Sequence, residues 1–156
     1  MYADPPAVQL LAFELSGRRL AVRVEQLVTI VRAVAITPLP QAPSFVDGII
    51  NLRGQVVPVI DLRRRFGLPP VPLGPDQRFV IVQGVPPRAL RVDRVDEVIV
   101  VPLEAIDHAD RVVPGAKHAA DVVRLPDGVI VIQDLDALLS SEDEVRLATA
   151  MAKAAG

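Results

Sequence analysis

The two histidines offer the first possibility of chemistry in this sequence. His108 and His118 are its only imidazoles, and Asp107 and Asp110 lie beside the first of them. Imidazole and carboxylate groups grouped in this way can hold a divalent metal ion. The segment also contains proline and glycine, which favours two ordinary loop histidines over a metal site. We therefore expect no metal and no other cofactor.

The other groups that could support catalysis have simpler interpretations. None of the four serines lies in a Gly-x-Ser-x-Gly elbow, no glycine-rich phosphate loop exists, and cysteine is absent. Acidic side chains near the C-terminus could do acid–base work, but acids at a helix start more simply complement the helix dipole. These acids are Asp134, Asp136, Glu142, Asp143 and Glu144. The sequence therefore predicts a protein that is not an enzyme.

A basic triplet, Arg63-Arg64-Arg65, follows Asp61, which can cap a short helical turn. Three adjacent cations could bind phosphate or an acidic partner. We interpret them instead as the solvated face of that turn.

Composition limits the class of protein. The chain has 156 residues, a net charge of −2, no tryptophan, one tyrosine and four phenylalanines. This length fits one domain, and the charge argues against binding nucleic acid by phosphate neutralisation. No signal peptide or stretch of 18 apolar residues is present, so we expect a cytoplasmic protein.

The elements that must position any site are mostly short strands. The chain contains 26 valines, 10 isoleucines and 15 prolines, a composition that favours strands and turns. A linker is predicted at 68–75, an irregular segment at 104–120, and a final helix at 141–154 opened by a Ser141-x-x-Glu144 capping box. The predicted strands are 8–15, 20–24, 28–36, 45–52, 56–60, 78–85, 89–92, 98–101, 121–125 and 129–132, and helical turns are predicted at 24–27, 61–66 and 134–139.

A weak internal repeat suggests two related halves. Residues 24–28 resemble residues 95–99, and Asp61-Leu62 resembles Asp134-Leu135 at nearly the same offset. Apolar strands also recur by chance in a valine-rich chain, and that explanation stays open. If the repeat is real, each half is a small five-stranded barrel, the first over about 8–75 and the second over about 76–139, with a helical tail at 140–156.

Residues 45–66 carry a resemblance to a known family. They read FVDGIINLRGQVVPVIDLRRRF, which is similar to the signature of the CheW-like family. Further similar pieces follow in family order at 13–15 with 20–22, at 79–82, at 90–98 and at 129–139. The resemblance extends from about residue 8 to residue 139, as a single CheW-like domain.

This resemblance implies both a fold and a function. The implied fold is all-β, with two five-stranded SH3-like β-barrel subdomains packed around a shared core and a short C-terminal helix. The implied function is a non-enzymatic adaptor of a chemotaxis array, which couples the cytoplasmic tips of methyl-accepting chemoreceptors to the regulatory domain of the histidine kinase CheA. Such an adaptor is cytoplasmic and recruited to membrane receptor arrays, with a helical receptor hairpin in the groove between the barrels. The alternative is a CheW-like binding module of another regulatory pathway, with a different helical partner.

The resemblance also assigns candidate site residues. Arg53, with Asn51 and Gly54, belongs to the signature. The positions implicated in receptor contact are Leu27, Gly48, Arg53, Phe79, Val95 and Val98. The apolar members could instead be core residues, and the glycines could serve the backbone alone. Members of the family usually carry a glutamate where Thr29 stands, so Arg53 needs another partner or faces solvent.

Overall fold

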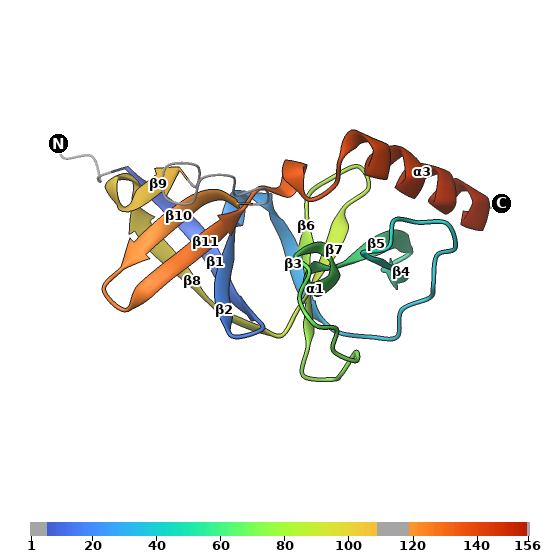
Figure 1. Ribbon diagram of the computed structural model, residues 1–156, viewed down its shortest axis with the longest axis horizontal. Coiled ribbons are helices and arrows are strands. Elements are labelled where there is room, and N and C mark those ends of the chain that lie inside the picture. The colour runs from blue at the N-terminus through green and yellow to red at the C-terminus, as the bar shows by residue number, and fades with distance from the viewer. Residues whose placement is uncertain (1–5, 109–118, 156) are drawn as a thin grey trace.

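The computed structural model describes residues 6–108 and 119–155 and has the predicted all-β fold. Two sheets lie side by side, and helix α3 (Ser141–Ala155) runs above the five-stranded one in the view of Figure 1. Among the described residues, no helix is long and apolar enough to span a bilayer.

The five-stranded sheet comes from one continuous stretch of chain. Its strand order is β3-β6-β7-β5-β4, in which β5 pairs with β7 in parallel and all other neighbours are antiparallel. A single turn, α1 (Leu62–Arg65), follows β5, and the side chain of Asp61 caps it as predicted. The strands are β3 (Leu27–Arg32), β4 (Val46–Leu52), β5 (Gln55–Asp61), β6 (Arg78–Val82) and β7 (Arg88–Val92).

The six-stranded sheet is built from both ends of the chain. Its order is β8-β1-β2-β11-β10-β9, in which β2 and β11 form the parallel pair. Short turns, η1 (Val24–Gln26), η2 (Leu103–Ala105) and η3 (Leu135–Ala137), follow β2, β8 and β11. The strands are β1 (Ala7–Leu15), β2 (Arg18–Arg23), β8 (Arg94–Pro102), β9 (Ile106–His108), β10 (Ala119–Leu125) and β11 (Gly128–Gln133).

The predicted repeat is present in the topology. Strand β11 lies between an antiparallel hairpin partner and a parallel neighbour, as β5 does in the other sheet. Asp134 also caps η3 with its side chain, as Asp61 caps α1. Strands β3 and β8 occupy equivalent sheet edges.

The predicted division into barrels at 8–75 and 76–139 is wrong. The hairpin that completes the five-stranded sheet, β6–β7, follows β5 directly, whereas the equivalent hairpin of the six-stranded sheet, β1–β2, comes from the start of the chain. The two units therefore span 27–92, and 7–23 together with 94–133. A repeat offset reveals how far apart equivalent residues lie, but not which hairpin pairs with which unit.

Three apolar clusters hold the fold together. One is formed by side chains of the six-stranded sheet, and a second, including Phe79 and Ile81, by side chains of the five-stranded sheet. The third, which we call the central cluster, joins the two sheets and α3, with Phe13, Leu90 and Leu147 among its members. Alternate residues of β1 enter different clusters, because side chains of a strand point to opposite faces in turn. The predicted shared core is this central cluster.

Helix α3 begins with a capping box one residue earlier than predicted. The hydroxyl of Ser140 accepts the N–H of Asp143 at 3.1 Å, and the carboxylate of Asp143 accepts the N–H of Ser140 at 3.1 Å. Ser141 and Glu144, the predicted pair, are not the cap. Glu144 is instead engaged by Arg88 of β7.

Candidate functional site

Edge strand β8 carries apolar residues on the sheet face that turns toward the central cluster. Val95 and Val98 stand opposite Phe13 and Leu11 of β1, which are buried in that cluster. Directly opposite residues of an antiparallel pair share a face. Val95 is half-buried against the cluster, whereas 51% of Val98 remains exposed.

Edge strand β3 has the same arrangement on the five-stranded sheet. Leu27 and Ile30 stand opposite Val82 and Val80, two buried members of the central cluster. Leu27 packs on the cluster, and Ile30 is 36% exposed. We call Leu27, Ile30, Val95 and Val98 the edge surface. Ile30 was not predicted, although apolar residues on both faces of 27–31 were a signal for it.

A hollow of about 420 Å³ lies beside this surface. Its walls include Val100 of β8 on one side and Val24 and Glu25 of η1 on the other, with the start of β1 between them. None of the four edge-surface residues lines the hollow, although η1 leads directly into Leu27 of β3.

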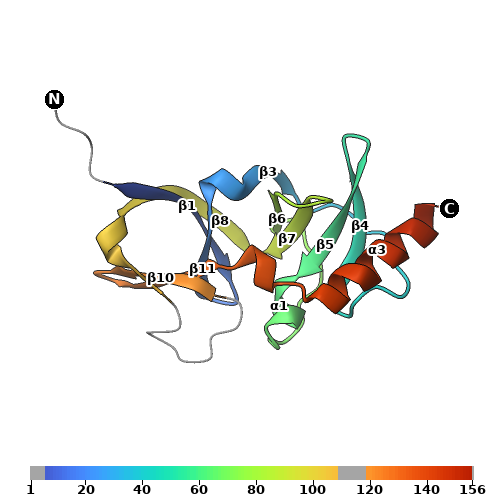
Figure 2. The same ribbon diagram turned by 90° about the horizontal axis from the view of Figure 1, so that it is seen from above.

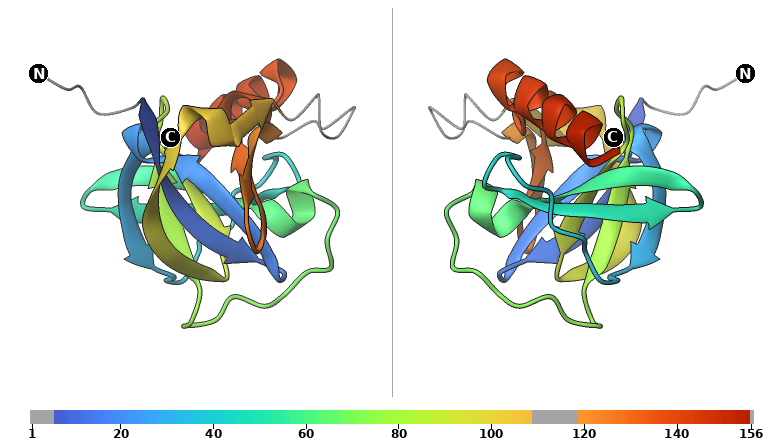
Figure 3. Two further views of the ribbon diagram at one scale, coloured as in Figure 1. Left: turned by 90° about the vertical axis from the view of Figure 1, so that its left-hand side faces the viewer. Right: turned by 90° about the vertical axis from the view of Figure 1, so that its right-hand side faces the viewer.

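Arg53 stands alone at the tip of the β4–β5 hairpin. The two central residues of the turn, Arg53 and Gly54, have φ of 51° and 86°, and the side chain of Asn51 accepts the N–H of Gly54 at 2.7 Å. The Arg53 side chain is exposed, and among the described residues no hydrogen bond or ion pair holds its guanidinium. The hairpin projects on the side of the molecule where β3 lies, opposite to α1 (Figures 2 and 3).

Two predicted contact residues lie inside the fold. Phe79 has no exposed area and sits in the core of the five-stranded sheet, so the prediction that it contacts a partner is wrong. Gly48 is buried with φ of 152°, and a Cβ there would lie 2.1 Å from the carbonyl oxygen of Thr37. Only glycine allows β4 to bridge to Thr37 in this way.

The predicted solvated face holds only for Arg64 of the arginine triplet, because Arg63 is buried and Arg65 is partly buried. Each arginine binds another part of the chain, and Arg65 also lies 4.8 Å from the ring centre of Phe45. The partners are Asp93 for Arg63, the carbonyl oxygen of Ser44 for Arg64, and the carbonyl oxygen of Leu138 for Arg65. The triplet therefore joins separate segments of the chain, and Arg63 and Arg65 are held within the fold.

The pKa of Asp93 is lowered. Burial would raise it, but the hydrogen bonds from Arg63 and from the N–H of Ser16, with the charges of Arg63 and Arg91, outweigh burial. Asp93 is therefore a carboxylate at neutral pH.

A cluster of charged side chains, centred on Arg91, belongs to the five-stranded sheet. The guanidinium of Arg91 binds Asp47 at 3.0 Å, Gln77 at 2.9 Å and the carbonyl oxygen of Val71 at 2.6 Å, and lies 3.8 Å from Asp61. Burial raises the pKa of Asp47, with the Asp61 charge adding to the rise, and Arg91 opposes it. Because Arg91 lies between the two acids, this cluster stabilises the fold and offers no free acid–base pair.

The histidine segment provides no metal site in the described part of the chain. His108 is exposed, and its Nδ1 lies 3.0 Å from one carboxylate oxygen of Asp121. The other oxygen of Asp121 accepts a hydrogen bond from Arg23 at 2.5 Å. Asp110 and His118 lie outside the described residues. Within those residues, no three acidic or histidine side chains are grouped to hold a metal ion.

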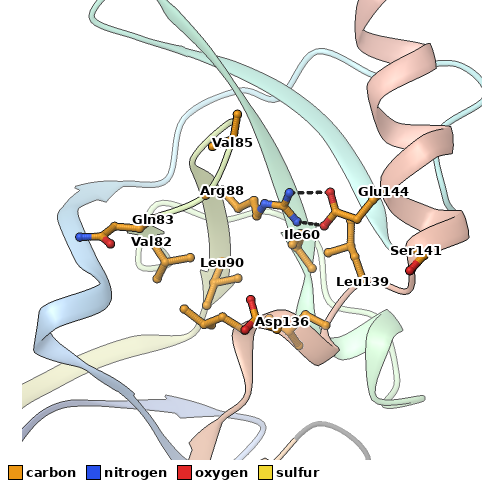
Figure 4. A pocket seen from close by; sticks show the side chains of 13 residues that line it. Ile60, Val82, Gln83, Val85, Arg88, Leu90, Asp136, Leu139, Ser141 and Glu144 are labelled. Carbon is orange, nitrogen blue, oxygen red and sulfur yellow. Dashed lines mark hydrogen bonds and ion pairs between the residues drawn. The ribbon is translucent and has the colours of Figure 1, made fainter.

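A cavity of about 340 Å³ lies where α3 joins the five-stranded sheet (Figure 4). Ile60, Val82 and Leu90 are among its apolar lining residues, and the Arg88–Glu144 ion pair lies at its edge. One arm of this bidentate pair measures 2.7 Å. Both charges are satisfied by each other, so the pair anchors α3 and does not await a ligand.

Comparisons with known proteins find one family over most of the chain. A family model described as the CheW-like domain matches residues 9–143. The chain is 29% identical to the chemotaxis protein CheW of Treponema pallidum (95% of this chain, 91% of that protein) and 30% identical to that of Bacillus subtilis (86% and 88%). The crystal structure of the scaffolding protein TtCheW from Thermoanaerobacter tengcongensis superposes with a TM-score of 0.80 at 30% identity, over 90% of this chain and 96% of that one.

Proposed function

The chain belongs to the family of CheW-like domains, and on this premise we propose that it is the scaffold that couples chemoreceptors to the histidine kinase CheA in a chemotaxis-type signalling array. It acts by binding and not by catalysis, and it works in the cytoplasm, recruited to receptors in the membrane. Holding receptor and kinase together lets a change in receptor conformation bias kinase activity.

The edge surface is the proposed receptor site. Amphipathic helices dock their apolar face against apolar surface, and Val98 and Ile30 offer such surface on two sheet edges beside the central cluster. Arg53 supplies a cation for a carboxylate or carbonyl group of the same partner. The exposed apolar residues on two equivalent edge strands are the observation that carries this proposal. The regulatory domain of the kinase docks elsewhere on the molecule.

The test is a charge placed at Val98. We expect Val98→Glu to abolish binding of a receptor-tip fragment in isothermal titration calorimetry while binding of the kinase regulatory domain persists, because a carboxylate would be buried without a partner. Val129→Glu is the matched control. Val129 lies on β11 of the same sheet and is 50% exposed, close to the 51% of Val98.

Receptor binding at normal strength by folded Val98→Glu protein, with the fold checked by circular dichroism, would contradict the receptor site. If the unsubstituted protein binds neither fragment, the coupling function itself is wrong. That result favours a CheW-like module that serves another regulatory pathway through a different helical partner.

A further inference from the structure

The chain crosses from the five-stranded to the six-stranded sheet through one residue, Asp93, which stands between the end of β7 and the start of β8. Its carboxylate accepts hydrogen bonds from both terminal nitrogens of Arg63, at 2.5 and 2.8 Å, and from the backbone N–H of Ser16 at 2.8 Å. Its own N–H donates to the carbonyl oxygen of Glu14 at 3.0 Å. The crossing is therefore held by four hydrogen bonds.

These bonds come from both sheets. Arg63 belongs to α1, which continues β5 of the five-stranded sheet, and its side chain is largely buried. Glu14 and Ser16 belong to the end of β1 and its turn, in the six-stranded sheet. Asp93 is thus hydrogen-bonded to both sheets. A bidentate ion pair of this kind is directional, whereas the apolar contacts of the central cluster are not.

We propose that Arg63 and Asp93 are positioning residues, whose ion pair sets the angle between the two sheets and so the shape of the edge surface. Strand β8 starts at the next residue, so Val95 and Val98 lie only two and five positions beyond Asp93. Strand β3 joins the other side of the crossing through β6 and β7. The effect on receptor binding rests on the function proposed above for this surface.

Removing the ion pair should leave each sheet folded but free the angle between them. Arg63→Gln removes both the charge and the two parallel N–H donors of the guanidinium, and Arg63→Lys keeps the charge alone. Arg94→Gln is the matched control, because Arg94 is the next arginine beyond the crossing and its ion pairs within the described residues are with Glu14 and Asp96 of its own sheet. If Arg63→Gln does not fold, Asp93→Asn tests the same pair with a side chain of equal size.

The first measurement needs no partner. Residual dipolar couplings of backbone amides report the orientation of each sheet in the intact protein. We expect the two sheets of Arg63→Gln to depart from the relative orientation in the unsubstituted protein, and those of Arg94→Gln to keep it. An unchanged orientation in folded Arg63→Gln protein overturns the proposal.

The second measurement is calorimetric affinity for the receptor-tip fragment. Affinity should fall about tenfold for Arg63→Gln, less for Arg63→Lys, and hardly at all for Arg94→Gln, in the range usual for residues that act through others. Normal affinity of Arg63→Gln alongside lost affinity of Val98→Glu overturns the positioning role and leaves the receptor site standing. Normal affinity of Val98→Glu overturns the receptor site itself.

Discussion

At the scale of single residues, Arg53 occupies a conformation that suits another amino acid. Both central residues of its turn have positive φ, the pattern of a type I′ hairpin turn, for which Asn-Gly is the preferred sequence. An arginine with φ of 51° is strained, and nothing in the described part of the chain holds its side chain in return. Strain of this kind is typical of functional positions.

We therefore expect Arg53→Asn to separate stability from function. Relief of the left-handed strain should stabilise the fold by about 1 kcal/mol and raise the Tm by about 2–4 °C. Receptor-fragment affinity should fall about tenfold, as at an interface hot spot. Calorimetric unfolding and binding measured on one preparation check both. A lower Tm with unchanged affinity would make Arg53 a structural residue.

Asp93 gives a pH-dependent prediction at the same scale. Because its pKa is lowered in the folded state, its ionised form stabilises the protein at every pH above the unfolded value, and this stability is lost as pH falls through the folded value. Asp93→Asn should thus cost about 1.5–3 kcal/mol at neutral pH, the range for hydrogen bonds to a charged group. Urea unfolding at a series of pH values should show this difference shrinking below about pH 4.

The signature predicted the position of Arg53 from sequence, but it could not separate surface from core at Phe79. Strand β6 is apolar on both faces, so alternation along it does not reveal which side chains a partner can reach. The Arg63–Asp93 pair was likewise invisible, because the two residues lie 30 positions apart and only the packing of the sheets brings them together.

At the scale of elements, sequence patterns located the strands well and their ends less well. Only 98–101 of β8 was predicted, because Asp96 and Glu97 break the apolar pattern. They fall where the register with β1 shifts, in the stretch that faces Ala12. In a regular strand these adjacent side chains would point to opposite faces, so one would face the buried side, whereas a bulge sets both opposite a single partner residue.

The start of α3 depends on which of two adjacent serines is the cap. Ser140→Ala should cost about 1 kcal/mol, because the N–H of Asp143 loses its acceptor. Ser141→Ala is the control and should cost less than about 0.5 kcal/mol, as an exposed position without that bond does. Thermal unfolding of both variants decides between them. A larger loss for Ser141→Ala would restore the cap that the sequence predicted.

At the scale of the whole molecule, the central cluster makes the two sheets one folding unit. Phe13 comes from the six-stranded sheet but belongs to a cluster that also contains residues of the other sheet and of α3. We expect one cooperative heat transition, and Phe13→Ala should lower the stability of both sheets together by about 3–5 kcal/mol. Amide signals from each sheet, followed by nuclear magnetic resonance during heating, measure this. Separate transitions for the two sheets would contradict it.

The sequence repeat indicated two β units but not their division, because the hairpin that completes the second unit precedes the first. This crossed construction has a consequence for synthesis on the ribosome. The β1–β2 hairpin emerges about 110 residues before β11, the strand beside which β2 must lie, is complete. At translation rates of about 5–20 residues per second, it waits roughly 5–20 s.

During that interval the newborn hairpin presents Leu10 and Ala12 on one face and Leu11 and Phe13 on the other, all of them buried in the finished protein. A two-stranded hairpin alone is only marginally stable in water. This hairpin is thus made well before the strands that shelter it, and we expect nascent-chain chaperones to bind it during that interval.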